Sequence, residues 1–193
     1  MRIFLDVGAH TGQTLAAVIG LGFDQIHCFE PAAICWPALE KLAERQATVW
    51  RFGLWNQTTT ATLYEPGQPG AGLWLKDSRA AMKDHTQPCR VVRASDWFAE
   101  HIGARDRVYL KLNCEGCECD VIDDLLDSGE FDKVAYLMVD FDARKIADLK
   151  HRPAQVMARL APFPPPRVLR TKQAMIGGTH RDRIRHWLGG LPQ

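Results

Sequence analysis

The stretch FLDVGAHTG, residues 4–12, decides the fold of this chain. It joins an apolar run to an acid, Asp6, and to two glycines, Gly8 and Gly12, spaced Gly-x-x-x-Gly. An apolar strand followed by a glycine turn and a helix is typical of nucleotide-binding α/β folds, in which the backbone approaches the ligand closely. Because the spacing differs from the Gly-x-Gly-x-x-Gly of dinucleotide-binding domains, a nicotinamide-dependent oxidoreductase is disfavoured.

Two acids frame this glycine turn. Asp6 would repel a pyrophosphate, whereas it would attract a ligand that carries an ammonium and a sulfonium group, such as S-adenosylmethionine. Glu30 ends the next predicted strand, where a carboxylate can accept hydrogen bonds from both hydroxyls of a ribose. Either acid alone is equally well explained as a solvated charge at a strand end. Together with the glycine turn, they predict a site for S-adenosylmethionine.

Strand and helix patterns alternate along the chain, which predicts an α/β fold with a mostly parallel central sheet and helices on both faces. The predicted strands are residues 2–7, 26–30, 48–54, 89–94, 108–112 and 134–140, and the predicted helices are residues 13–21, 37–45, 96–102 and 117–126. We further expect a small hairpin of residues 58–64 and 73–75, a loop at 76–88 over the binding face, and an antiparallel C-terminal strand in a hairpin around Gly177-Gly178.

We expect one domain over residues 1–193, whose first half, about 1–75, binds the cofactor and whose second half, about 76–193, faces the substrate. The formal net charge of +1 gives no reason to expect a nucleic-acid partner. No apolar run has the length of a membrane span, and the apolar start is too short for a signal peptide. A cytoplasmic protein is therefore expected, and an exposed sheet edge makes a homodimer reasonable.

The six cysteines include a close group, Cys114, Cys117 and Cys119, that resembles a metal-ligand cluster. A structural zinc site needs four ligands, and no second Cys or His pair accompanies the group. We therefore expect free thiols and no metal. Among the tryptophans, Trp74 is the one expected to contact the substrate, since it lies in the irregular middle of the chain.

Three segments resemble the FkbM family of methyltransferases: FLDVGAHTGQT, HCFEPAAICWPALEK and YLKLNCEGCECDVIDDLL. The third resembles the family's Lys-x-Asp-x-Glu-Gly-x-Glu signature and is the most specific, because the first two occur across Rossmann-like methyltransferases. The likeness runs from about Arg2 to about Asp140. It implies a class I, Rossmann-like methyltransferase fold, S-adenosylmethionine as cofactor, and usually O-methylation of a sugar, lipid or natural-product hydroxyl.

The resemblance also implies which residues bind the cofactor. They are Asp6, Gly8 and Gly12 at the methionine end, with His10 in the same loop, Glu30 at the ribose, and Gly53, Leu54 and Trp55 around the adenine, where Asp96 is a weaker candidate.

The catalytic candidates Lys111, Asn113 and Glu115 come from the third segment. Asn113 stands where the family usually has Asp; an amide can position a hydroxyl or an amino group, but it cannot act as a general base. Glu115 is the first candidate for the base, with His10 as the second, while Lys111 steadies developing charge or pairs with Glu115. Alternatively, Glu115 and Glu118 only place favourable charge at the start of the following helix.

The leading functional hypothesis is an O-methyltransferase that acts on a small molecule or glycan. The alternative is a non-catalytic module that binds S-adenosylmethionine and regulates or scaffolds a partner enzyme, which Asn113 favours. The sequence leaves the acceptor unidentified.

Overall fold

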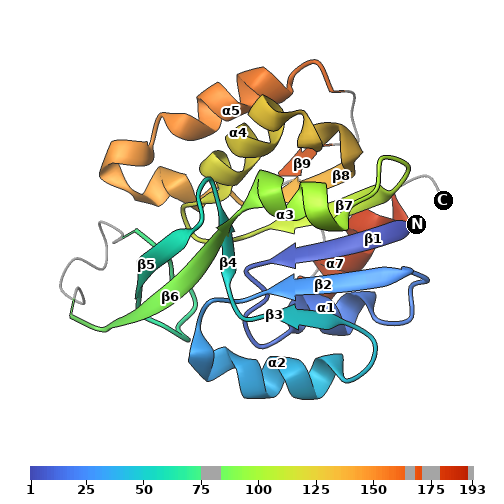
Figure 1. Ribbon diagram of the computed structural model, residues 1–193, viewed down its shortest axis with the longest axis horizontal. Helices are drawn as coiled ribbons and strands as arrows, with labels where there is room; N and C mark the ends of the chain where they lie inside the picture. The colour runs from blue at the N-terminus through green and yellow to red at the C-terminus, as the bar shows by residue number, and fades with distance from the viewer. Residues whose placement is uncertain (75–83, 164–167, 171–178, 191–193) are drawn as a thin grey trace.

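The computed structural model of the chain describes residues 1–74, 84–163, 168–170 and 179–190. Its central sheet has six strands in the order β3-β2-β1-β7-β8-β9, and each neighbouring pair runs parallel (Figure 1). The strands are β1 (Arg2–Val7), β2 (Gln25–Phe29), β3 (Thr48–Trp50), β7 (Arg107–Leu112), β8 (Val134–Val139) and β9 (Val168–Arg170). The predicted parallel sheet is confirmed.

Helices cover both faces of this sheet, as predicted. One face packs against α1 (Gln13–Val18), α2 (Trp36–Ala43) and α7 (His180–Gly189), and the other against α3 (Ala94–His101), α4 (Glu118–Ser128) and α5 (Arg152–Leu160). Short 3-10 helices lie at Ala33–Cys35, Glu130–Lys133, Asp142–Lys145 and Ala147–Leu149.

Alternation along β1 assigns its side chains to the two faces. Ile3, Leu5 and Val7 belong to the core beneath α3, α4 and α5, whereas Phe4 belongs to the core beneath α1, α2 and α7. Asp6 therefore faces the same side as Phe4, toward α1 and α7.

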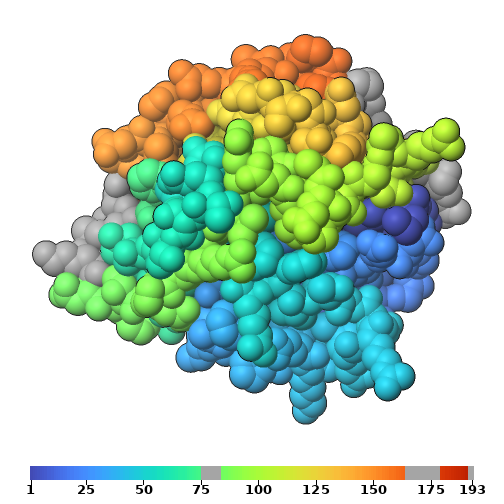
Figure 2. All heavy atoms as spheres, in the orientation of Figure 1, coloured from blue at the N-terminus to red at the C-terminus, as the bar shows by residue number. Residues whose placement is uncertain are grey.

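A second, three-stranded sheet has the order β4-β6-β5, formed by β4 (Gly53–Trp55), β5 (Thr59–Tyr64) and β6 (Thr86–Arg93). In the space-filling view, β5 and β6 form the flank opposite the N-terminus (Figure 2). The single strand predicted at 48–54 is wrong, because β3 and β4 lie in different sheets. Phe52, between them, turns inward onto Phe29 and Trp50, with ring centroids 6.0 and 5.5 Å apart.

The predicted hairpin of residues 58–64 and 73–75 is also wrong. β5 pairs antiparallel with β6, and only Tyr64 pairs with Gly72, in an isolated bridge. Of the loop expected at 76–88, residues 86–88 belong to β6, and residues 76–83 lie outside the described residues, as does Leu75 of the predicted hairpin.

At the C-terminal end, β9 runs parallel to β8, and the expected antiparallel strand is not among the strands of the described residues. The hairpin expected around Gly177-Gly178 lies outside the described residues. Two helices were not predicted, α5 and α7. α7 buries Ile184 and Trp187. No helix in the described part of the chain combines the length and apolarity that crossing a bilayer requires.

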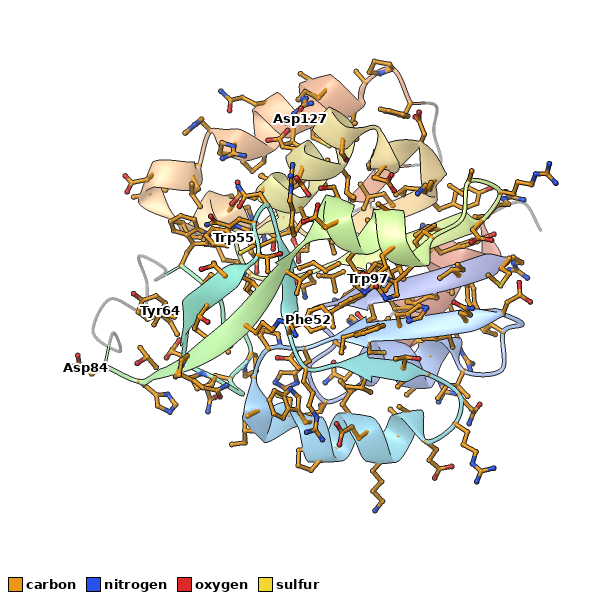
Figure 3. All side chains as sticks on the ribbon, in the orientation of Figure 1. Phe52, Trp55, Tyr64, Asp84, Trp97 and Asp127 are labelled. Carbon is orange, nitrogen blue, oxygen red and sulfur yellow. The ribbon has the colours of Figure 1, made fainter. Side chains whose placement is uncertain are left out.

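Aromatic side chains fill the space between α3 and the central sheet. Trp97 of α3 lies edge-on to Phe29 of β2, with centroids 4.9 Å apart, and stacks on His101 at 4.5 Å. Figure 3 labels Trp97 and Phe52 in this layer. Trp50 and Trp97 thus belong to one aromatic cluster that packs against β2.

Candidate functional site

A pocket opens at the carboxyl ends of β1, β2 and β7. The strand order changes direction between β1 and β7, and open α/β sheets bind their ligands at such a switch point. The pocket volume is about 210 Å³, whereas one water molecule needs only about 10–15 Å³. The space is therefore suited to an organic ligand.

Most residues predicted for the site line this pocket. They are Gly8, His10, Glu30, Gly53, Leu54, Lys111, Asn113 and Glu115. Four predicted cofactor residues do not line it: Asp6, Gly12, Trp55 and Asp96. Asp96 is exposed in the first turn of α3, so it lies outside the pocket.

Glycine is required at positions 8 and 12 for different structural reasons. Gly8 has φ +81°, and a Cβ there would lie 2.0 Å from the backbone oxygen of Asn113. Gly12 has φ +93°, and its Cβ would meet the side chains of Leu42 and Leu39 at 2.7 and 3.2 Å. Gly8 therefore allows the ends of β1 and β7 to approach beneath the pocket, whereas Gly12 allows α1 to pack on α2.

Glu30 follows β2, and two backbone N–H groups hold its carboxylate. Ala32 donates to Oε1 at 2.8 Å and His10 donates to Oε2 at 2.7 Å. The residue is only 6% exposed, and burial raises the pKa of Glu30, an effect that these two hydrogen bonds oppose. Because a carboxylate oxygen can accept more than one hydrogen bond, both oxygens retain capacity for donors in the pocket.

Asp6 is fully buried and forms an ion pair with Lys111, with 2.9 Å between Oδ1 and Nζ. Lys111, which is 3% exposed, also donates to the carbonyl oxygens of Gly8 at 2.8 Å and Val7 at 3.5 Å. The sequence allows Lys111 to pair with Glu115, whereas the structure pairs it with Asp6. The charge of Asp6 is compensated by a neighbouring strand, so it does not act on a ligand as an isolated anion.

Asn113 continues from β7 into the pocket. Its backbone N–H donates to the carbonyl oxygen of Val7 at 3.1 Å, which fixes the position of Asn113 beside β1. Its side-chain Oδ1 is buried and has no hydrogen-bond partner among the described residues. Buried acceptors in native proteins are nearly always paired, so this oxygen is suited to a donor supplied by a ligand.

The turn after Asn113 is held by Glu118. Gly116 has φ +125°, and its N–H donates to both carboxylate oxygens of Glu118, at 3.0 and 3.1 Å. Burial raises the pKa of Glu118 to about 8, and the nearby charges of Asp142 and Glu115 add to this effect. Glu118 thus lies in the first turn of α4, as the alternative interpretation expects, but its carboxyl group is buried and shapes the turn.

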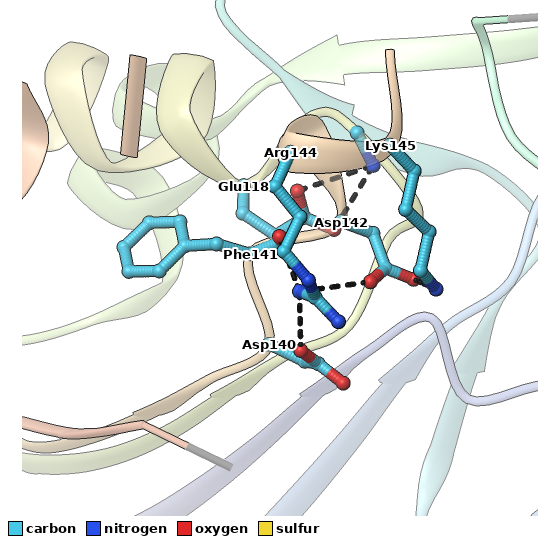
Figure 4. A network of polar contacts seen from close by, with 7 residues as sticks. Glu118, Asp140, Phe141, Asp142, Arg144 and Lys145 are labelled. Carbon is cyan, nitrogen blue, oxygen red and sulfur yellow. Dashed lines mark hydrogen bonds and ion pairs between the residues drawn. The ribbon is translucent and has the colours of Figure 1, made fainter. Parts of the chain in front are cut away.

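A polar network lies behind this turn (Figure 4). Asp142 is buried and pairs with Lys145 at 2.7 Å and Arg144 at 3.2 Å, and Arg144 also reaches Asp140 at 2.9 Å. The two cations offset the charge of Asp142, which would otherwise add further to the cost of ionising the neighbouring Glu118.

His10 fastens a segment that covers the pocket. Its ring Nε2 lies 3.1 Å from the carbonyl oxygen of Gly67, and its Nδ1 lies 3.3 Å from Thr11 Oγ1. A carbonyl only accepts hydrogen bonds, so Nε2 carries the proton and Nδ1 accepts from the hydroxyl. Both ring nitrogens are therefore engaged, which disfavours His10 as a base. Residues 68–73, which follow Gly67, line the pocket and form what we term the cover segment.

Sequence reasoning missed His180, the first residue of α7, which also lines the pocket. Its Nε2 lies 2.8 Å from Oγ1 of the buried Thr14 in α1. Burial and the charge of Lys111 lower the pKa of His180, and Asp6 acts in the opposite direction. No local pattern connects a residue near the C-terminus to the first helix, so no signal in the sequence was available.

The remaining residues singled out by the sequence are the cysteines, which resemble a metal-ligand group, and Trp74, which was expected to contact the substrate. Cys114 and Cys117 line the pocket, and burial raises the pKa of both thiols well above the usual range. Among the described residues, no group of three or more His, Cys, Asp or Glu side chains is arranged to hold a metal ion. Trp74 lies against Gly116 and edge-on to Trp55, with centroids 6.4 Å apart, and does not line the pocket.

Comparison of the chain with models of known protein families, with curated proteins and with solved structures finds no match. The function of the pocket must therefore be inferred from the residues that line it.

Proposed function

We propose that this chain binds S-adenosylmethionine in the pocket at the ends of β1, β2 and β7 and transfers its methyl group to a hydroxyl of a small molecule, sugar or lipid. The observation that carries the proposal is the Glu30 carboxylate, fixed by two backbone N–H groups at the wall of a pocket at the switch point. Membership of the FkbM family, to which three sequence segments are similar, is part of this proposal.

The lining residues fit the separate parts of this cofactor. Glu30 offers acceptors for the two ribose hydroxyls, and Asn113 Oδ1 offers a buried acceptor for the ammonium of the methionine part. Leu54, Leu63 and Val91 supply an apolar wall for the adenine ring. Glu30 and Asn113 thus offer polar contacts beside an apolar wall, as expected of a site for an organic cofactor.

The charges at the pocket disfavour a phosphate-bearing ligand. Lys111 is the only Lys or Arg among the described lining residues, and it is paired with Asp6. Glu30 adds a carboxylate to the pocket wall, and an ionised carboxylate there would repel a pyrophosphate. A cofactor without phosphate and with positive charge suits this balance better.

Methyl transfer from a sulfonium is an in-line displacement, so the protein mainly aligns the acceptor with the methyl group and excludes water. The cover segment and α7 would exclude water. An acceptor hydroxyl also needs a base within hydrogen-bond reach, and both Glu115 and His180 line the pocket.

Isothermal titration calorimetry with S-adenosylhomocysteine tests the proposal. Hydrogen bonds to a charged group contribute about 1.5–3 kcal/mol, so we expect Glu30→Gln to weaken binding roughly 10- to 100-fold. The matched control is Asp96→Asn, which changes an exposed acid outside the pocket and should leave the affinity unchanged.

Correctly folded protein that gives no heat with S-adenosylhomocysteine, or that is stabilised equally by NAD, would refute the proposal. Binding without methylation of any acceptor in a broad panel of hydroxyl compounds would instead favour the non-catalytic module. Asn113, where the resembled family usually has an acid, is the residue that keeps this second function under consideration.

A further inference from the structure

We infer that His180 is the general base of this site and that Thr14 is the residue that orients it; the inference rests on the proposed methyl transfer. His180 lines the same pocket as Gly8 and Asn113, and it is close enough to Lys111 and Asp6 for their charges to act on it, at the end of the pocket where the methionine part of the cofactor is proposed to lie. The acceptor hydroxyl would be deprotonated by an imidazole supplied by the last described helix and not by the segment after β7.

The position of His180 is fixed from two directions. Thr179 begins α7 with a capping box: its Oγ1 accepts from Asp182 N at 3.2 Å, and the Asp182 carboxylate accepts from Thr179 N at 3.1 Å. Further along α7, Trp187 is buried against Phe4 of β1, with centroids 6.2 Å apart. The first residue of the helix is therefore held over the same face of the sheet that carries Asp6.

The hydrogen bond to Thr14 selects the nitrogen that would take the proton. If Nε2–H donates to Thr14 Oγ1, Nδ1 has the free lone pair, and it forms no hydrogen bond within the described part of the chain. Thr14 is buried at the start of α1, directly after the glycine turn, so the orientation of the imidazole is tied to the cofactor loop. A base whose second nitrogen is held by another residue is the usual arrangement in catalytic sites.

The surrounding charges suit a base that is neutral before the reaction. Lys111 on β7 and Arg183 on α7 disfavour the imidazolium, whereas Asp6 on β1 favours it. The positive charge of a bound sulfonium would further disfavour the imidazolium before transfer. His180 would therefore enter the reaction unprotonated at neutral pH.

In the transfer step, the acceptor oxygen forms a bond to the methyl carbon as the carbon–sulfur bond breaks, and the electron pair of that bond stays on sulfur. The hydroxyl proton passes to Nδ1 of His180 and later to solvent. The positive charge leaves the sulfur and appears on the imidazole, so the net charge of the pocket is unchanged during the step. A buried environment tolerates such a relocation better than the creation of a new charge.

Nuclear magnetic resonance of the imidazole groups tests this role without an acceptor. The chain has seven histidines, and the signal lost in His180→Gln identifies the one of interest. We expect ring nitrogen shifts of the Nε2–H tautomer in the wild type, retained in Thr14→Ser and lost in Thr14→Val. His101, stacked on Trp97 and outside the pocket, is the internal control.

The same signal is then titrated with pH in the presence of S-adenosylhomocysteine or of sinefungin, which carries an amine where the methyl group would be. Because a like charge within about 4–6 Å shifts a pKa by about 1–3 units, the pKa of His180 should be at least one unit lower with sinefungin. Equal values with the two ligands, or an Nδ1–H tautomer in the wild type, would overturn the inference. Absence of binding by S-adenosylhomocysteine would overturn the proposed function as well, and calorimetry distinguishes that outcome.

Discussion

The buried pair of Asp6 and Lys111 leads to a prediction whose size follows from the structure. Lys111→Met removes the cation but leaves the Asp6 carboxylate fully buried, with no hydrogen-bond donor among the described residues. It also removes the donor to the Gly8 carbonyl oxygen. Loss of one partner of a buried pair typically costs about 3–5 kcal/mol of unfolding free energy.

The charge contribution to this loss has a ceiling, because the stranded carboxylate can be protonated. An aspartyl carboxyl of ordinary pKa near 3.9 needs about 4 kcal/mol to be protonated at pH 7 and about 1.5 kcal/mol at pH 5. The native variant then binds more protons than its unfolded state, so its stability falls as pH rises. We expect a loss of about 3–5 kcal/mol at pH 7 that shrinks by about 2–3 kcal/mol at pH 5.

Urea unfolding followed by circular dichroism at both pH values measures the loss. The double variant Asp6→Asn/Lys111→Met should recover most of it, because no charge is stranded. Arg51→Met is the control: it breaks the pair with Glu40, in which the two side chains are 57% and 38% exposed, and almost no loss is expected there because solvent screens both charges. A loss below about 1 kcal/mol for Lys111→Met, or an equal loss at pH 5 and pH 7, would refute a structural role for the pair.

Two further predictions concern the strand ends. Gly8 and Gly20 both have φ +81°. A Cβ at Gly8 would lie 2.0 Å from the backbone oxygen of Asn113, whereas a Cβ at Gly20 would have no atom within 4 Å. Gly20→Ala should therefore cost about 1–2 kcal/mol of unfolding free energy through backbone strain. Gly8→Ala should cost at least about 3 kcal/mol and should also abolish the binding of S-adenosylhomocysteine. Equal melting temperatures of the two variants would contradict this. Since the native pKa of Glu118 is about 8, above its unfolded value, its contribution to stability is full below about pH 4.5 and is lost as pH rises to 8. Glu118→Gln should remove this slope, on the order of 3–5 kcal/mol, and parallel pH profiles of wild type and variant would show that the carboxyl ionises freely.

Local patterns predicted the elements that carry the site. Residues 2–7, 26–30 and 108–112 were expected to be buried strands, and β1, β2 and β7 coincide with them to within a residue or so. The apolar run of a buried strand and the glycine turn that follows it are properties of a few neighbouring residues. Both patterns can therefore be recognised without knowledge of the rest of the chain.

Other features depended on contacts between distant residues. The run TVWRFGLW, residues 48–55, reads as one apolar strand, yet it divides because β3 pairs with β2 and β4 pairs with β6. His180 reached the pocket only because α7 packs on α1. Periodicity carries no information about either partner.

The sequence by itself determined that strand, turn and helix succeed one another around Gly8, and that Asp6 and Glu30 stand at the ends of strands. The tertiary structure decided what those acids do. The register of β1 against β7 sets Asp6 opposite Lys111, which compensates its charge, while Glu30 keeps its carboxylate at the pocket wall. Whether a charge is paired or available depends on burial and on which strands are neighbours, and both are properties of the folded sheet as a whole.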